Sequence, residues 1–409
     1  MREPPGVPER LIPLVEELRA EFPETSWPSI WLTGGTVRDA FLGREGNDLD
    51  LAAAVQPELL ARRGFRPVQG RSTAPIWFRY TSDRGKVEIT LLAEGVGIVA
   101  DLQRRDFTMN AVAVDLAGEV TDPLAGRQDL ERGEIVPCSG KTFIDDPLRV
   151  FRAFRFAAEG FHLSGGVREL LDREEWDRLL ERIPVERFSR ELLRALASPR
   201  PDLFFRLMLR YRSGRLILPE LFAMPRVPAG PQEYHPEGDL FRHSCQVLTA
   251  VAASTADPLA RYCAFLHDIG KLASDPALHP RHHGHEEAGF AAASELGRRL
   301  QLPREYGRAL AWVCRLHGKA NRLETLRPGT AIGLAEQALK GGVDGILPLV
   351  SAADSPGGMD QALWRKLLDV ARMTVRQLGI DQESLLRVPE EKRGEVILQR
   401  RVEVLRKPG

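Results

Sequence analysis

The sequence contains no apolar run near the ~20 residues that a membrane-spanning helix needs. Its first ten residues, MREPPGVPER, lack the apolar core of a secretory signal peptide. Low-complexity tracts and internal repeats are missing as well. These absences argue against a membrane protein, and we expect a cytoplasmic one.

Cysteine is scarce, and neither sign of charge is in excess. The four cysteines form no CxxC pair, so the sequence indicates neither a zinc ribbon nor a disulfide framework. Lys+Arg and Asp+Glu both number 57, which gives a formal net charge of zero. A nucleic-acid partner would therefore need a local basic face, because the chain has no global positive field.

The pattern of apolar residues changes along the chain. Residues 30–120 read as mixed α/β and the chain from about residue 145 onwards as helical, so the expected fold class is α+β. A Pro- and Gly-rich stretch, Pro225 to Pro236, is expected to be a linker. Strands are expected near 30–33, 48–55, 75–81, 86–92 and 111–116, and helices near 9–22, 36–42, 57–63 and 99–104. The expected divisions are 1–140, 141–225, 226–380 and a charged tail, 381–409.

One stretch, Trp31 to Val55, carries the densest chemistry. Gly34 and Gly35 follow a short apolar run, and they allow a phosphate to approach the backbone at a helix N-terminus. Asp48 and Asp50 lie two apart on the next expected strand, so they share a face. Two carboxylates so close need a cation between them, and Mg²⁺ is the usual one beside phosphates. The alternative is a hairpin with exposed acids.

Three further residues extend this candidate site. Glu88, in the second strand of an expected hairpin, is the candidate third carboxylate, and a solvent-facing strand glutamate is the competing interpretation. Asp106 and Asn110 can bond sugar hydroxyls, and an arginine beside them can bind phosphate. The competing role of Asp106 is to cap its own turn.

Asp146-Pro147 predicts a helix start, with Pro147 in the first turn and Asp146 as the N-cap. Asp146 and Arg149 lie three apart and share a face. A carboxylate acceptor with a guanidinium donor can pair with the edge of a nucleobase. The alternative is a capped helix with one surface ion pair. The apolar stripe of this helix would be Leu148, Phe151, Phe154 and Ala158.

Most of the nine histidines lie between residues 235 and 285. Imidazole and carboxylate ligands on neighbouring helices suit a divalent transition metal or Mg²⁺, and a bound metal would activate water for attack on a phosphoester. Isolated buried histidines are more often structural, which is the alternative. The candidate ligands are His243, His267, Asp268 and Asp354, and His282, His283 and His285 can supply further ligands or contact phosphate.

These motifs together resemble the class II tRNA nucleotidyltransferases, the CCA-adding enzymes and their poly(A) polymerase relatives. The resemblance rests on Gly34-Gly35-Thr36-Val37-Arg38-Asp39, Asp48-Leu49-Asp50, Arg104-Arg105-Asp106 with Asn110, Asp146 with Arg149, and His267-Asp268-Ile269-Gly270-Lys271, and it covers nearly the whole chain. It implies a polymerase-beta-like head, a helical neck and body, and a C-terminal HD domain. The family commonly has Glu where this chain has Asp145, which leaves the support of Arg149 open.

The resemblance also implies roles for these residues. Asp48 and Asp50 would hold Mg²⁺, with Glu88 as the candidate third carboxylate, while the HD domain would hold a divalent metal of undetermined identity. The implied substrates are the tRNA 3′ end with CTP and ATP. The HD domain implies phosphohydrolase activity, with a role only as a tRNA-binding scaffold as the open alternative. The implied nucleotide-binding residues are Gly34, Gly35, Arg38 and Arg105 for the triphosphate, Asp106 and Asn110 for ribose, and Asp146 and Arg149 for the base, with Arg152 added to the same site.

One departure from the family bears on specificity. Only 15 residues separate Glu88 from Arg104, whereas a longer mobile loop is expected there in enzymes that switch from CTP to ATP. The short segment favours addition of CC, with full CCA addition as the open alternative. Poly(A) polymerase, a phosphohydrolase with a sensing nucleotidyltransferase head, and a non-enzymatic RNA-binding protein are the rival interpretations. The sequence leaves the oligomeric state open.

Overall fold

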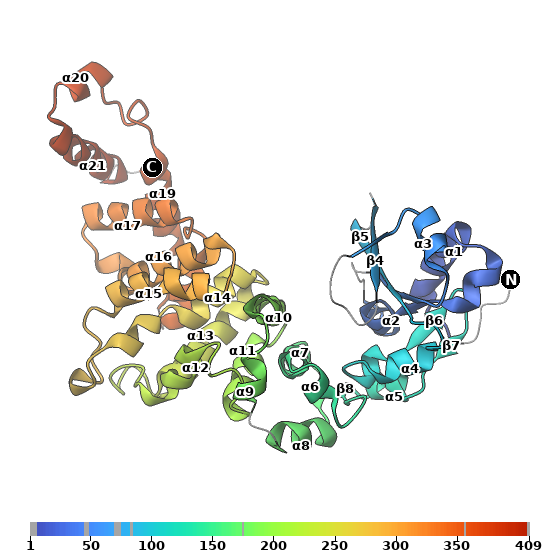
Figure 1. Cartoon of the computed structure of the whole chain (residues 1–409). Helices are drawn as coiled ribbons and strands as arrows, with labels where there is room; N and C mark the ends of the chain where they lie inside the picture. Colours follow the sequence, from blue (N-terminus) through green and yellow to red (C-terminus); the bar gives the residue numbers. More distant parts are fainter. Residues whose placement is uncertain are drawn as a thin grey trace. The chain divides into compact units, whose positions relative to one another are not determined.

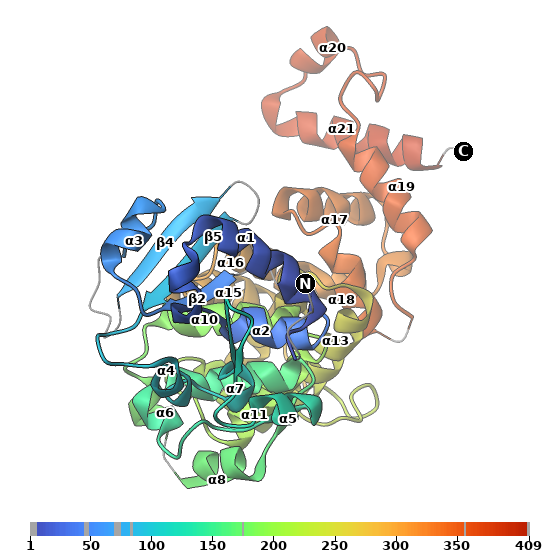
Figure 2. The same cartoon turned by 90° about the vertical axis from the view of Figure 1, so that its right-hand side faces the viewer.

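The computed structural model describes residues 6–44, 49–68, 75–81, 85–173, 176–355 and 357–406. Its contacts divide the chain into two compact units, Met1–Glu175 and Trp176–Gly409. Figures 1 and 2 show both units. A unit built on a β-sheet and a second, helical unit confirm the expected α+β class.

One mixed sheet forms the centre of the first unit. Its strands lie in the order β3-β4-β5-β2-β1-β6-β7, and β2 and β5 run parallel while the other neighbours are antiparallel. Two short strands, β8 and β9, pair in a separate parallel sheet. The strands are Ile30–Thr33 (β1), Leu49–Ala53 (β2), Arg66–Pro67 (β3), Ile76–Thr81 (β4), Gly85–Leu91 (β5), Ala113–Asp115 (β6), Val120–Thr121 (β7), Glu134–Ile135 (β8) and His162–Leu163 (β9).

Helices α1 to α5 lie between or before the strands of the main sheet in the sequence or directly after them, and α6 to α8 follow. The expected helices near 36–42, 57–63 and 99–104 are present within about two residues of their predicted bounds, and the one near 9–22 is a 3-10 helix, Glu9–Leu11, continued by α1. The α-helices are Ile12–Glu21 (α1), Gly34–Phe41 (α2), Pro57–Arg62 (α3), Ile98–Gln103 (α4), Gly126–Glu131 (α5), Thr142–Asp145 (α6), Leu148–Ala158 (α7) and Gly165–Arg173 (α8), with short 3-10 helices at Glu9–Leu11, Glu24–Ser29 and Thr108–Asn110.

The two faces of the sheet belong to two different cores. Leu51 of β2 is buried in the larger core with side chains of α1, α2 and α3. Its neighbour Ala52 faces a smaller core that includes Leu102 of α4. Because side chains alternate along a strand, Asp50 lies on the same side as Ala52, away from the larger core. The sheet therefore presents this carboxylate on its less heavily covered face.

The second unit is helical throughout its described residues (Figure 1). None of the described helices of the chain is both long and apolar enough to cross a membrane. The α-helices are Asp177–Leu180 (α9), Val185–Ala197 (α10), Pro201–Arg210 (α11), Pro219–Ala223 (α12), Leu240–Ser254 (α13), Pro258–Leu266 (α14), His285–Arg299 (α15), Arg304–Ala320 (α16), Pro328–Gly341 (α17), Ile346–Asp354 (α18), Gln361–Arg372 (α19), Gln382–Leu386 (α20) and Glu390–Arg406 (α21). The 3-10 helices are Met224–Arg226, Ile269–Ala273, Pro276–Leu278 and Leu323–Thr325.

The stretch from Pro225 to Pro236 is not a linker, contrary to the expectation from its composition. Ala229 within it is fully buried, and its amide donates to the carbonyl of Gly238 at 2.9 Å. The carbonyl of Ala229 in turn accepts from the ammonium of Lys271 at 2.6 Å. Proline and glycine permit bends as readily as they permit flexibility, and here the bends fold the segment against α13 and the helix that contains Lys271.

Candidate functional site

The glycine pair of the first motif lies beside a carboxylate and two guanidinium groups. Gly34 has a positive φ of 60°, which glycine adopts without strain. A Cβ atom at Gly34 would lie 3.2 Å from Oδ2 of Asp50 and 3.1 Å from Nη1 of Arg105, and one at Gly35 would lie 3.7 Å from Nη2 of Arg38. Because both residues are glycines, a ligand can approach the backbone between the Asp50 carboxylate and the Arg38 and Arg105 guanidinium groups.

The sheet register brings two of the predicted carboxylates together. Asp50 of β2 and Glu88 of β5 are direct partners in the parallel pair, so their side chains lie side by side on one face. Neighbouring strands are about 4.8 Å apart, a separation that one metal ion can bridge with oxygen ligands on each side. Asp48, the other predicted ligand, falls outside the described residues. The residues present fit a Mg²⁺ ion, which prefers such oxygens.

Glu88 also has a partner of its own. The Lys86 ammonium, two residues earlier on β5, donates to the Glu88 carboxylate, and this hydrogen bond raises the pKa of Lys86. The Glu88 side chain is 41% exposed. Both interpretations made from the sequence, a metal-facing acid and a solvent-facing strand acid, are therefore compatible with its position. Its catalytic role stays a prediction.

Polar side chains from three motifs form one continuous network. Nη1 of Arg38 donates to Oδ1 of Asn110 at 2.7 Å, and Nδ2 of Asn110 donates to Oδ1 of Asp106 at 3.0 Å. Nε of Arg152, on α7, donates to Oδ2 of Asp106 at 2.7 Å. The network joins the first motif to the second and to the start of the helical neck, and it fixes the orientation of two arginines.

Asp106 is the buried anion at the middle of this network. Burial alone would raise the pKa of its carboxyl, but Arg152, the Asn110 amide and the Phe107 backbone amide favour the anion and hold the pKa at about 2. Its visible partners are therefore protein groups, as they are for the buried Asn110. Direct contact of these two side chains with ribose stays a prediction, and their observed effect is to hold Arg38 and Arg152 in place.

The predicted base-reading pair lies at the start of α7. Oδ1 of Asp146 accepts from the Leu148 amide at 3.2 Å, although the N-cap position itself is Pro147, one residue later than predicted. Nη2 of Arg149 donates to the carbonyl of Arg104 at 2.7 Å, and its Nη1 donates to the carbonyl of Thr142 at 3.2 Å. Backbone carbonyls thus fix the guanidinium. The predicted apolar stripe of Leu148, Phe151, Phe154 and Ala158 is buried.

In the second unit the four predicted metal ligands meet at one point. His243 lies on α13, His267 and Asp268 follow α14, and Asp354 ends α18. Nε2 of His243 lies 2.9 Å from Oδ1 of Asp354, and Nε2 of His267 lies 3.3 Å from both Oδ1 of Asp354 and Oδ2 of Asp268. One potential ligand atom from each of the four lies within 4.8 Å of the others. The predicted constellation is thus present as a cluster that could hold one ion.

The second ring nitrogen, Nδ1, of His243 and of His267 is also hydrogen-bonded. Nδ1 of His267 lies 2.9 Å from the carbonyl of Ala264, and Nδ1 of His243 lies 2.8 Å from Oε1 of Glu237. A carbonyl or carboxylate oxygen only accepts, so each Nδ1 carries a proton, and Nε2 is the nitrogen whose lone pair can bind a metal when the ring is neutral. Each Nε2 faces carboxylate oxygens, an arrangement that a positive charge between them stabilises. The donor set fits a divalent metal.

The electrostatics of the cluster agree with this geometry. Burial alone would lower the pKa of His267, but Asp268 and Asp354 raise it to about 10. Burial acts to raise the pKa of Asp268, yet Lys271 and His267 hold it well below its ordinary value. The surroundings of these carboxylates therefore favour a positive charge at Nε2, supplied by a proton or by a metal ion.

Sequence reasoning assigned the neighbouring histidines only in part. Nε2 of His285 lies 3.4 Å from Oδ1 of Asp268, as a further ligand would. His283 is exposed, and Nε2 of His282 is bonded to the carbonyl of Pro228 at 2.8 Å, so the structure does not place these two in the cluster. His317 was missed: its Nε2 lies 3.3 Å from the same Asp268 oxygen. It stands alone in the sequence, with no nearby ligand to mark it.

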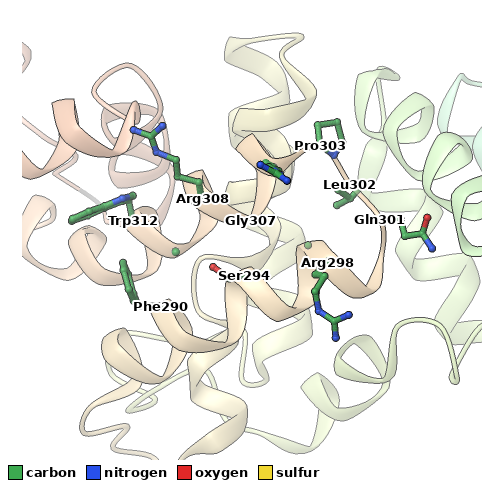
Figure 3. A pocket seen from close by; sticks show the side chains of 12 residues that line it. Phe290, Ser294, Arg298, Gln301, Leu302, Pro303, Gly307, Arg308 and Trp312 are labelled. Atoms are coloured by element: carbon green, nitrogen blue, oxygen red, sulfur yellow. The ribbon is translucent and has the colours of Figure 1, made fainter.

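Two cavities of the helical unit differ in the residues that line them. One of about 360 Å³ adjoins the histidine cluster and is lined in part by His235, Lys271, Arg281 and His285. The other, of about 500 Å³, lies between α15 and α16 and contains none of the ligand residues (Figure 3). Of these two cavities, the first lies next to the candidate metal ligands, because His285 in its wall is 3.4 Å from Asp268.

Three family profiles match the chain. The poly A polymerase head domain matches residues 72–136, the HD domain matches residues 240–345, and the probable RNA and SrmB-binding site of polymerase A matches residues 173–224. The last match includes α10 and α11.

Curated relatives match over most of the chain. The multifunctional CCA protein of Methylococcus capsulatus is 34% identical over 350 residues, covering 80% of each chain. That of Xanthomonas campestris pv. campestris is 34% identical over 391 residues, covering 87% of this chain and 92% of the relative.

Solved structures share the fold at lower identity. The Thermotoga maritima CCA-adding enzyme complexed with tRNA-CCA superposes with a TM-score of 0.65 at 21% identity, covering 97% of this chain and 92% of that one. The Bacillus stearothermophilus CCA-adding enzyme in complex with CTP gives a TM-score of 0.58 at 23% identity, covering 93% and 84%.

Proposed function

The chain belongs to the family of multifunctional CCA proteins, which are tRNA nucleotidyltransferases, and from this premise we propose that it adds CMP to the 3′ end of tRNA at the Gly34–Asp50 site. The observation that carries the proposal is the meeting of Asp50, Glu88 and the open glycine backbone at one point of the sheet. This arrangement places carboxylates where a metal is needed and backbone amides where a triphosphate is needed.

The side chains of this chain have separate tasks in the proposed reaction. Mg²⁺ held by Asp48 and Asp50 would activate the tRNA 3′ hydroxyl and stabilise the leaving pyrophosphate. The Gly34 and Gly35 backbone, with Arg38 and Arg105, binds the triphosphate and neutralises its charge. The Asp106–Asn110 pair holds Arg38 in the orientation that this contact requires.

The start of α7 supplies the base-reading surface. Asp146 offers an acceptor and Arg149 a donor fork, and the carbonyls of Arg104 and Thr142 fix that fork. A fixed donor and acceptor select the incoming base by hydrogen bonding to its edge, so no nucleic-acid template is required. Arg152 completes the site by joining α7 to Asp106.

The connection after β5 supports a preference for CTP. Six residues, 92–97, join Leu91 at the end of β5 to Ile98 at the start of α4. Leu92 is buried beside Leu102, and its amide donates to the carbonyl of Ala53 at 2.8 Å. A short connection that is fixed to the sheet at its first residue leaves few residues that could rearrange around a second nucleotide. We therefore propose that synthesis stops after CC.

A tRNA transcript that lacks its 3′ CCA tests both proposals when CTP alone, ATP alone or both are supplied. Two additions with CTP and no extension with ATP are the expected result. Three additions with both nucleotides would overturn the CC preference and leave the transferase assignment standing. A ladder with ATP alone would point to poly(A) polymerase instead.

For the helical unit we propose phosphoester hydrolysis at the His243, His267, Asp268 and Asp354 cluster. The proposal rests on buried imidazole and carboxylate donors beside the cavity of about 360 Å³. Release of phosphate from phosphomonoesters and opening of 2′,3′-cyclic nucleotides, measured after loading with Mn²⁺, Co²⁺ or Ni²⁺, provide the test. Hydrolysis that survives Asp268→Ala would contradict it.

A further inference from the structure

A row of side chains crosses the sheet of the first unit on the face that carries Asp50. Glu88 of β5 pairs with Asp50 on one side and with Phe78 of β4 on the other. Phe78 pairs in turn with Arg66 of β3. Trp77, the neighbour of Phe78, packs against the larger core on the opposite face. Because directly paired residues share a face, the row continues from the candidate metal ligands to the β3 edge of the sheet (Figure 2).

An exposed aromatic side chain lies beside this row. Tyr80 is 72% exposed, and it shares a face with Phe78 because the two residues are two apart on β4. Their rings meet edge to face with centroids 5.8 Å apart. The ammonium of Lys86, which is opposite Tyr80 in the register, lies 5.5 Å from the centroid of the Phe78 ring. The Tyr80 ring is therefore supported by its neighbours and open to solvent, as a ring that stacks on a nucleobase must be.

The proposed nucleotide site lies on the other side of Asp50. Gly34 follows β1, which pairs with β2 on the side away from β5. A Cβ atom at Gly34 would lie 3.2 Å from Oδ2 of Asp50 and 3.1 Å from Nη1 of Arg105. Arg149, the proposed base reader, is bonded to the carbonyl of Arg104, the residue before Arg105. The triphosphate and the incoming base thus take the β1 side of the carboxylates, which leaves the side of β5 and β4 for the second substrate.

The direction of attack connects that side with the tRNA. In transfer to a phosphorus atom, the attacking and leaving oxygens lie roughly in line on opposite sides of it. With the triphosphate on the β1 side, the tRNA 3′ hydroxyl approaches from the β5 side. Phe78 is two strands from Asp50, about 10 Å away at the ordinary strand spacing. A nucleoside whose 3′ hydroxyl lies at the carboxylates therefore extends its base towards β4, where Tyr80 lies.

We propose that Tyr80, packed edge to face on Phe78, binds the 3′-terminal nucleotide of the tRNA substrate by stacking on its base. This inference rests on the proposed transferase function and names a binding residue for its second substrate. Arg66, exposed and opposite Phe78 in the register, is placed to neutralise a phosphate of the same RNA strand. Stacking needs only the flat face of a base, so the contact suits the last nucleotide of the tRNA before and after each addition.

Steady-state CMP incorporation by the full-length Tyr80→Ala variant tests the proposal. The tRNA transcript lacks its 3′ CCA, and its concentration is varied at saturating CTP, then CTP is varied at saturating tRNA. We expect kcat/KM for tRNA to fall about 10-fold, the usual effect of losing one base-stacking contact, and KM for CTP to stay unchanged. Tyr80→Phe keeps the ring and should behave as the starting protein does. Tyr80 is exposed, so the fold should tolerate its truncation.

Two controls separate stacking from a general loss of RNA binding. Tyr234→Ala removes an equally exposed tyrosine, 72%, from the helical unit, and kcat/KM for tRNA should stay at the starting value. A transcript whose 3′-terminal nucleotide lacks its base removes the other half of the contact. The starting protein should lose about 10-fold in kcat/KM on this transcript, whereas Tyr80→Ala should lose nothing further, because the effects of removing two partners of one contact do not add.

The outcomes distinguish this inference from the proposed function. An unchanged kcat/KM for tRNA in Tyr80→Ala, or full additivity of the variant with the transcript that lacks the terminal base, would overturn this inference alone. A loss that appears in KM for CTP would place the ring at the incoming nucleotide and would overturn it as well. Absence of CMP incorporation by the starting protein would overturn the transferase proposal together with this inference.

Discussion

The two candidate sites of this chain are built in opposite ways. In the first unit, oxygen ligands on adjacent strands lie on an incompletely covered face of a sheet, and arginines supply the neighbouring charge. In the second unit, imidazoles and carboxylates from the ends and faces of three helices meet in a buried cluster. The open oxygen site suits Mg²⁺ with phosphates, whereas the buried nitrogen-rich site suits a transition metal.

The side chains of the two sites are held in place in different ways. In the first unit the functional side chains hold one another, as in the chain from Arg38 through Asn110 and Asp106 to Arg152. In the second unit a carboxylate or a backbone carbonyl accepts a hydrogen bond from Nδ1 of each imidazole. Each ligand is therefore oriented even before an ion binds. We therefore expect substitutions in the first unit to spread through the network and those in the second to act locally.

The largest expected effect is a reciprocal loss of the two activities. Asp50→Ala should lower CMP incorporation at least about 10³-fold and leave metal-dependent phosphoester hydrolysis unchanged, because it removes charge from one site only. Asp268→Ala should abolish hydrolysis and leave incorporation unchanged. Both activities are measured on the same preparations, so each variant controls for the folding of the other unit. Loss of both activities in a folded variant would mean that the sites are not independent.

The next effect concerns Glu237, which is hydrogen-bonded to the predicted ligand His243. Oε1 of Glu237 lies 2.8 Å from Nδ1 of His243, and its side chain is only 8% exposed. Glu237→Gln should weaken metal binding by about 10- to 100-fold, the usual effect of losing the partner of a metal-bound histidine. Isothermal titration with Mn²⁺ in an Asp50→Ala background measures it, and Glu233→Gln, at an exposed position, is the matched control. Equal affinities in both variants would show that Glu237 does not orient His243.

Glu237 also shows where prediction from the sequence stops. Asp50 and the glycines could be placed because their spacing along one strand and one turn is short, and alternation fixes the face on which Asp50 lies. Glu237 and His317 could not be placed from the sequence, because tertiary packing brings them to the cluster from a bent segment and a separate helix. The Pro- and Gly-rich composition around Glu237 indicated a linker, since composition does not distinguish a flexible segment from a folded, bent one.

The Asp106 network provides a pH test. Its folded pKa of about 2 lies below the ordinary 3.8, so the ionised carboxyl contributes stability that is present above about pH 4 and is lost as the pH falls towards 2. Asp106→Asn should lower the free energy of unfolding by about 2 kcal/mol at pH 6, and the difference should shrink between pH 4 and pH 2.5. Urea unfolding at several pH values measures it. A difference that stays constant with pH would assign the effect to shape alone.

The smallest expected effect decides the role of Glu88. Its carboxylate lies beside Asp50 in the register, yet it is 41% exposed and paired with Lys86. If Glu88 assists the metal, Glu88→Gln should lower kcat about 10-fold, whereas Lys86→Met, which removes only the ion pair, should leave kcat unchanged. If the ion pair is its whole role, both variants should behave alike, since exposed pairs contribute about 1 kcal/mol or less. Steady-state CMP incorporation by the two variants separates these outcomes, because only a carboxylate shared with the metal site makes them differ.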